Sequence, residues 1–202
     1  MSNCDCELEI KDKSQRGILI ALLCINATMF VFEISIGWWA ESTALIADAL
    51  GMLADALVYA VGLYAVGKTL QVKVNAAMIS GILQLLLGLL VLLDISRRLI
   101  VGSEPVSELM MIMGFIALLA NVICLRLIAK HRKGEVHMRA SWIFSKNDVI
   151  ANFGVIVAGA LVWYLDSRWP DIVIGTLVAI IILMGAKNII QDAKQEKDNY
   201  SA

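Results

Sequence analysis

The chain has 202 residues, of which 59% are hydrophobic and only 17% charged, and its formal net charge is -1. A soluble domain of this length has too little interior to bury so many apolar side chains, so the composition excludes an ordinary soluble protein. The near-neutral charge, and basic residues with no aromatic residues interleaved among them, also argue against a nucleic-acid partner.

The apolar residues form six blocks, each close to the roughly 20 residues that a helix needs to cross a lipid bilayer. We therefore expect an all-α protein, a bundle of six transmembrane helices, with spans at Gly17–Ala40, Thr43–Gly67, Val74–Leu93, Leu109–Leu125, Val149–Leu165 and Ile172–Ala186. The last two blocks gain length from flanking residues such as Trp142, Trp169 and Pro170.

Basic residues predict the orientation of these spans. Most of them precede the first block, follow the last, or lie in the second and fourth connections, whereas Arg97, Arg98 and Arg168 lie on the other side. Because positive charge is retained in the cytoplasm, both termini are expected there. Residues 1–15 and 193–202 are then cytoplasmic tails around a six-span unit at 16–192. The polar start argues against a cleaved signal peptide, and the short loops suggest a bacterial inner membrane.

The four cysteines say little about redox chemistry. Cys24 and Cys124 lie inside spans and are expected to be small packing residues. Cys4 and Cys6 stand beside two acidic residues on the N-terminal tail and could capture a soft metal ion transiently. A solvated, disordered leader is the favoured interpretation of that tail.

Carboxylates inside the spans are the most informative feature. An ionised carboxylate in hydrocarbon costs at least about 2.5–3.5 kcal/mol, so Asp48, Asp55 and Asp148 should face a protected polar site. Asp48 and Asp55 are two helical turns apart on one face with Gly51 between them, and Asn152 is one turn from Asp148. If these two faces meet, they form an oxygen-lined cage that suits a divalent cation.

Enzyme functions fit the same residues poorly. An intramembrane aspartyl protease usually has glycines around its second aspartate, and Asp148 has none beside it. A lipid head-group transferase would need further charged residues after Asp55, where Ala56 to Tyr59 follow. The two histidines, His131 and His137, precede the fifth span and are expected to be interfacial residues, not ligands. No cofactor is expected.

Two segments carry a resemblance to a known family. Glu41–Ala56 resembles the second-span signature of the cation diffusion facilitator family of metal/proton antiporters, and Met138–Val157 resembles the fifth span of that family. Trp169–Val173 is similar to the start of its sixth span, and the resemblance covers Arg16–Asp192 in order and spacing. It implies export of a divalent metal ion in exchange for protons, with zinc as the commonest cargo.

The sequence departs from the family pattern at two ligand positions. The resemblance implies His or Asp four residues before the aspartate on each of the two helices, where this chain has Gly51 and Phe144. Asp48 and Asn152 could then serve as substitute ligands, completed by water or a backbone carbonyl near Gly51. A cage without imidazole or thiolate favours harder ions such as Mn(II), while Fe, Co and Cd stay open. The cytoplasmic metal-sensing domain usual in the family is not expected here.

Other polar or small residues have two interpretations each. Gly81 and Gly88 permit close helix contact, either within the bundle or in a homodimer held by the helices. Asn26 and Glu33 line the cavity or form an interhelical hydrogen bond. Asp94 is explained by an interfacial ion pair with the neighbouring arginines, and Asp171 suits a helix N-terminus.

The sequence therefore predicts a secondary active transporter that exports a divalent transition-metal ion from the cytoplasm, with protons and lipid as its other partners. The alternative is a transport-incompetent relative that binds and regulates a membrane partner. A cation channel is a weaker third option, because the third and sixth spans show little of a continuous polar stripe.

Overall fold

The structure is a computed structural model that describes the backbone of residues 2–39, 43–102 and 106–201, and the side chains of residues 11–35, 49–102 and 106–200. These residues form six α-helices and a short 3-10 turn. The elements are α1 (Ser2–Trp39), α2 (Thr43–Ala65), α3 (Leu70–Val101), α4 (Ser107–Ile128), η1 (Ala129–His131), α5 (Val136–Leu165) and α6 (Trp169–Ser201). The all-helical prediction is confirmed, and the backbone expected to be a disordered leader is helical from Ser2.

The distribution of side chains is that of a membrane protein. Large apolar residues such as Leu93, Phe153 and Met184 are 59–65% exposed, whereas Asn26, Gln84 and several other polar residues are buried. Five described helical stretches are long and apolar enough to cross a bilayer, and Ala49–Ala65 of α2 forms a shorter apolar stretch. The chain is a multi-pass integral membrane protein.

Helix ends coincide with residues suited to them. Gly67 (φ 73°) turns the chain between α2 and α3, and a Cβ atom there would lie 2.9 Å from an Asp12 carboxylate oxygen on α1. Gly102 (φ 94°) ends α3, and its N–H donates to the Arg98 carbonyl. Pro170 stands in the first turn of α6, where its missing N–H is not needed.

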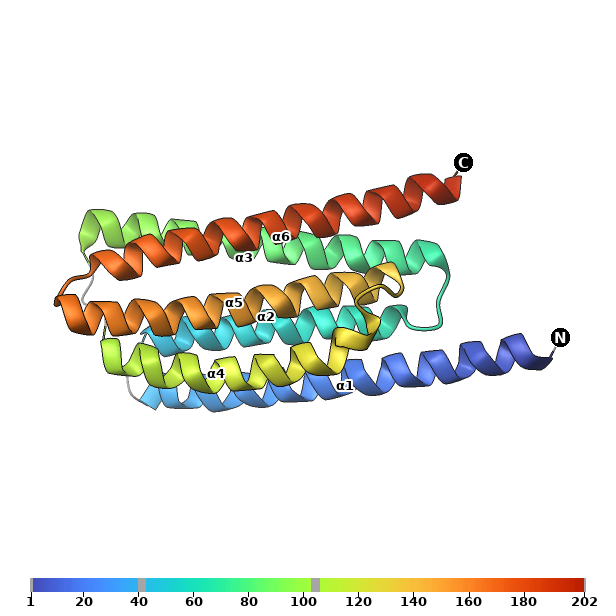
Figure 1. Ribbon diagram of the computed structural model, residues 1–202, viewed down its shortest axis with the longest axis horizontal. Helices are drawn as coiled ribbons and strands as arrows, with labels where there is room; N and C mark the ends of the chain where they lie inside the picture. Colours follow the sequence, from blue (N-terminus) through green and yellow to red (C-terminus); the bar gives the residue numbers. More distant parts are fainter. Residues whose placement is uncertain (1, 40–42, 103–105, 202) are drawn as a thin grey trace.

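The six helices lie roughly along one direction, and the chain ends of α1 and α6 emerge at the same end of the bundle (Figure 1). α3 and α6 form one extensively packed pair, while α1 packs on α2 and α4 packs on α5. The α1–α4 and α2–α5 contacts join the latter two pairs into a four-helix group, and α5 also packs against α6. The candidate site lies inside that four-helix group.

Glycines bring α3 and α6 together. A Cβ atom on Gly81 would lie 2.7 Å from the Ile190 Cγ1 atom, and one on Gly88 would lie 2.7 Å from the Leu183 Cδ2 atom. Both glycines therefore face α6 of the same chain. The intramolecular interpretation of these residues is confirmed, and they are not available as a contact with a second copy.

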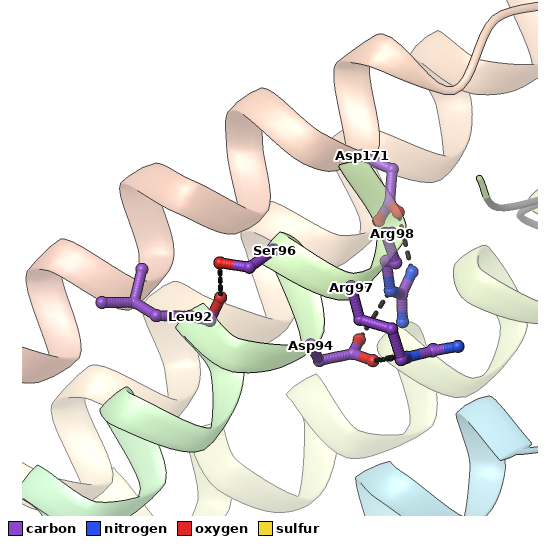
Figure 2. Close-up of polar contacts among 6 residues, drawn as sticks. All are labelled: Leu92, Asp94, Ser96, Arg97, Arg98 and Asp171. Atoms are coloured by element: carbon purple, nitrogen blue, oxygen red, sulfur yellow. Dashed lines mark hydrogen bonds and ion pairs between the residues drawn. The ribbon is translucent and has the colours of Figure 1, made fainter. Parts of the chain in front are cut away.

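Ion pairs tie the helices at both ends. At one end, the Arg98 guanidinium donates to Asp94 of its own helix at 2.6 Å and to Asp171 of α6 at 2.8 Å, while Arg97 also pairs with Asp94 (Figure 2). The expected interfacial ion pair is confirmed, and Asp171 also accepts a bond from α3. At the other end, Arg139 of α5 binds both Asp192 oxygens and the Glu196 carboxylate of α6.

A third ionic group fixes the connection before α5. Glu135 accepts from Lys11 of α1 at 3.0 Å and from Lys73 of α3 at 2.9 Å, so one carboxylate links three parts of the chain. Burial raises the pKa of Glu135, but the hydrogen bonds from Lys73 and Lys11 outweigh this and lower the pKa to about 2.

Substitution of Gly81 tests the α3–α6 contact. Gly81→Val should lower the free energy of unfolding by about 1–3 kcal/mol, because the added side chain has no space beside Ile189 and Ile190. Gly17→Val on α1 is the matched control, since a Cβ atom at Gly17 meets nothing within 4 Å. Thermal unfolding in detergent measures both, and equal midpoints would contradict the close packing.

Acid titration tests the Glu135 ion pairs. The pKa of Glu135 is depressed in the folded protein, so its ion pairs stabilise the fold above about pH 4.5, and this contribution is lost as the pH falls toward about 2. Glu135→Gln should cost about 1–2 kcal/mol at neutral pH and nothing near pH 2. Glu108→Gln on the exposed start of α4 is the control and should match the wild type throughout.

Candidate metal centre

Two of the predicted ligands lie near the same side chains inside the bundle. Asp55 of α2 is only 4% exposed, and Asp148 of α5 is half-buried with its Oδ2 atom buried. Both carboxylates act electrostatically on the Tyr59 phenol of α2 and the Cys124 thiol of α4. The two helices that the sequence singled out, α2 and α5, contact each other.

The register between the two helices can be read from their contacts. Ser145 lies beside Tyr59, and the Ser141 Oγ atom would be 3.3 Å from a Cβ atom on Gly62. Because α2 and α5 run in opposite directions (Figure 1), lower residue numbers on α2 lie level with higher residue numbers on α5. One turn further, Asp55 comes level with Asp148, and another turn brings Gly51 level with Asn152.

Of the remaining two predicted ligands, the structure describes the side chain of Asn152 but not that of Asp48. Asn152 is 8% exposed and lies one turn from Asp148 on α5, so its amide belongs to the same stripe. Asp48 belongs to the backbone of α2, but its side chain lies outside the described residues. The side chains of Cys4 and Cys6 lie outside them as well.

The site offers few strong metal ligands among the described side chains. Among the side chains that the structure describes, no group of three or more His, Cys, Asp and Glu residues is placed to hold a metal ion. Two carboxylates with neutral oxygen ligands from Asn152, backbone or water could still hold a divalent cation. The site therefore suits transient binding of a cargo ion better than a permanent metal centre.

The two unusual positions have opposite surroundings. A Cβ atom on Gly51 would meet nothing within 4 Å, so there is open space beside the backbone there. Phe144 is 1% exposed and packs in the apolar core with Leu19, Leu22 and Tyr59. One missing ligand thus leaves room, and the other is replaced by a ring that fills its place.

Several residues near the site were not predicted from the sequence. Cys124 was interpreted as a packing residue, yet it interacts electrostatically with both aspartates and accepts a hydrogen bond from the Asn26 amide at 3.5 Å. Tyr59 lies one turn after Asp55, and this spacing could have identified it. The Asn147 amide of α5 fills the space beside Gly185 of α6, with the Gln84 amide of α3 nearby, and this close approach had no signal in the sequence.

Three further polar residues, Asn26, Glu33 and His137, are buried inside the bundle. Asn26 forms the interhelical contact with Cys124 and also donates to the Leu22 carbonyl, while Glu33 is fully buried on the same helix. His137, in the first turn of α5, is 1% exposed and lies inside the bundle.

Comparison with known proteins decides the family. A family model of the cation efflux transmembrane domain matches residues 19–196. The chain belongs to this family, the cation diffusion facilitators. Membership indicates a transporter rather than an enzyme.

The chain is similar to several curated members. It is 25% identical over 201 residues to the zinc transporter ZitB of Yersinia pestis, covering 92% of this chain and 64% of that protein. It is 24% identical over 194 residues to a cadmium, cobalt and zinc/H(+)-K(+) antiporter of Bacillus velezensis, covering 89% and 62%. For the zinc transporter ttm-1 of Caenorhabditis elegans the identity is 23%, covering 90% and 53%. The chain thus spans less than two thirds of the length of these relatives.

Substitutions at the two unusual positions should behave differently. Gly51→Asp should be tolerated, because the position is open, and should strengthen Zn(II) binding about tenfold by adding a carboxylate opposite Asn152. Phe144→His should destabilise the fold by about 2–4 kcal/mol, because it replaces a buried aromatic ring in the core. Isothermal titration and thermal unfolding in detergent check both, and weaker binding in Gly51→Asp would contradict the placement.

Proposed function

We propose that this protein exports a divalent transition-metal cation from the cytoplasm in exchange for protons. The observation that carries the proposal is that Asp55 and Asp148 act electrostatically on the same neighbours, Tyr59 and Cys124, from two different helices. Carboxylates buried in a lipid-embedded bundle are costly and therefore indicate an ion or proton site.

The proposed ligands of the cargo ion are Asp48, Asp55, Asp148 and Asn152. Asp55 and Asp148 supply negative charge, which offsets the cost of removing the ion from water. Asn152 adds a neutral amide oxygen, and Asp48 lies two turns before Asp55 along α2. Water or a backbone carbonyl in the space beside Gly51 completes the set.

Exchange follows from competition for the same oxygens. A carboxylate binds a metal ion only when it is deprotonated, so the ion and protons exclude each other at Asp55 and Asp148. With the site open to the cytoplasm the ion binds and protons leave. When the bundle opens to the other side, protons displace the ion, and their inward gradient drives export.

The cargo proposed is zinc. Relatives are named as zinc transporters or as a cadmium, cobalt and zinc antiporter, which supports a borderline ion. The oxygen-rich ligand set would also accept Mn(II), Fe(II), Co(II) or Cd(II). Binding titrations across these ions would rank them.

The proposed orientation places both termini in the cytoplasm of a bacterial inner membrane. The two chain ends emerge at one end of the bundle, where the α2–α3 and α4–α5 connections also lie (Figure 1). Lys11 and Lys73 pair with Glu135 of the α4–α5 connection. Positive residues are retained on the cytoplasmic side. In this arrangement residues 16–192 form the membrane unit, and 1–15 and 193–202 lie on the cytoplasmic side.

A specific observation favours a second candidate function. Phe144 fills the place of an expected ligand with apolar core packing. A relative that had lost transport could keep its fold and act as a regulatory partner of another membrane protein. Reconstitution separates the two, since the regulator would show no proton flux with any of the divalent ions above.

Neutralising the aspartates tests the exporter. Asp55→Asn and Asp148→Asn should each reduce zinc-driven proton flux in reconstituted vesicles at least a hundredfold, because the amide neither releases a proton nor neutralises the ion. Folding should be retained, as shown by an unchanged elution profile in detergent. Wild-type flux in either variant would contradict the proposal.

Asp166→Asn is the matched control for these variants. Asp166 is exposed between α5 and α6 and has a φ of 45°, a left-handed conformation that Asn adopts as readily as Asp. The same chemical change there should leave the flux unchanged.

A further inference from the structure

A continuous row of polar side chains runs along α5 from its first turn to Asp148. His137, Ser141 and Ser145 follow one another at intervals of four residues, and Asp148 lies one turn further on the same side. His137 is 1% exposed, and both serines are fully buried. The row spans roughly 16 Å along the helix axis, about half of the hydrocarbon thickness.

Residues of α2 lie opposite this row of polar side chains. The Tyr59 phenol lies beside Ser145, and Gly62 leaves the space that the Ser141 hydroxyl occupies. Tyr59 is completely buried. We refer to His137, Ser141, Ser145 and Tyr59 as the polar seam.

Buried atoms of the seam lack hydrogen-bond partners among the described groups. They include both ring nitrogens of His137 and the Oδ2 atom of Asp148. Leaving such groups unpaired in an apolar interior is unfavourable. Bridging waters relieve that cost where several polar atoms lie together, and they would connect the groups into a chain.

The seam ends at charged groups at the proposed cytoplasmic end. The Glu135 Oε2 atom lies 3.9 Å from His137 Nδ1, and the Glu135 side chain is 21% exposed. Lys73 of α3, Lys11 of α1 and His131 of η1 also act electrostatically on His137. Two lysines repel a divalent cation at this point, whereas a proton can pass from an imidazole beside a carboxylate.

Apolar packing also makes the seam unsuited to a metal ion. Leu19 lies against position 62, and Phe144, Met138 and Ile128 complete the same core cluster. α5 has no acidic residue between Glu135 and Asp148, so the seam offers a divalent ion only neutral hydroxyls and one imidazole, without charge to offset its desolvation. Protons need only a row of hydroxyls, imidazole and water.

We propose that the polar seam is the cytoplasmic proton path of this protein, separate from the route of the metal ion. The inference rests on the proposed metal/proton exchange and extends it. When the ion binds, a proton leaves the Asp148 or Asp55 carboxyl group, passes through waters held by Ser145, Tyr59 and Ser141, and reaches the His137 ring. The imidazolium then gives it to water beside Glu135, so each proton lost by the carboxyl group appears in the cytoplasm.

Zinc-driven proton flux in vesicles of phosphatidylethanolamine and phosphatidylglycerol tests the seam. His137→Gln and Ser145→Ala should each slow the initial exchange rate about tenfold while the Zn(II) dissociation constant in detergent changes less than twofold. The solvent deuterium isotope effect on the rate should increase in both, because proton transfer becomes limiting. Ser145→Ala removes a single oxygen and keeps the test valid if His137→Gln folds poorly.

A matched control separates the path from general effects on folding. Ser80→Ala removes a buried serine of α3 and should exchange at the wild-type rate. Normal rates in both seam variants, or a parallel loss of zinc affinity, would overturn the proposed proton path but leave the proposed function standing. Absence of proton flux in the wild-type protein would overturn the proposed function and the seam with it.

Discussion

The exclusion of water from the bilayer core determines most of this structure. Charged groups in hydrocarbon are costly, so each buried polar side chain must face another helix or a hydrated path. Asp55 is buried inside the bundle and Asp148 is half-buried, while large apolar residues such as Leu93 and Phe153 face outward. The same requirement explains why polar residues follow single stripes on α1, α2 and α5 rather than scattering around each helix.

Helix pairing supports this polar interior in two different ways. Apolar side chains give little driving force for association in lipid, so α3 and α6 rely on close packing at Gly81 and Gly88 and on ion pairs at both ends. The four helices around the site instead enclose polar groups such as Asn26, Asp55 and Asn152. α5 contacts both groups of helices.

The two departures from the family pattern have different physical meanings. Gly51 removes a ligand and leaves a space beside the backbone that no described side chain fills. Phe144 removes a ligand and adds core packing, so it stabilises the bundle at the position where a metal ligand would weaken it. A site with fewer strong ligands binds its ion less tightly and releases it more readily, which is compatible with transport but also with loss of transport.

The sequence by itself determined the all-helical fold class and predicted six helices, because hydropathy and helical spacing are local properties of the chain. The pairing of Asp55 with Asp148 stays a prediction. The sequence also determined the family, through two motifs on separate spans. Only the tertiary structure decided the register of α2 against α5, the packing of Gly81 and Gly88 against α6, and the burial of His137. These depend on how side chains from distant segments fit together, and the same local pattern is compatible with several such fits. Cys124 illustrates the difference, since nothing near it in the sequence distinguishes a packing residue from a neighbour of two carboxylates.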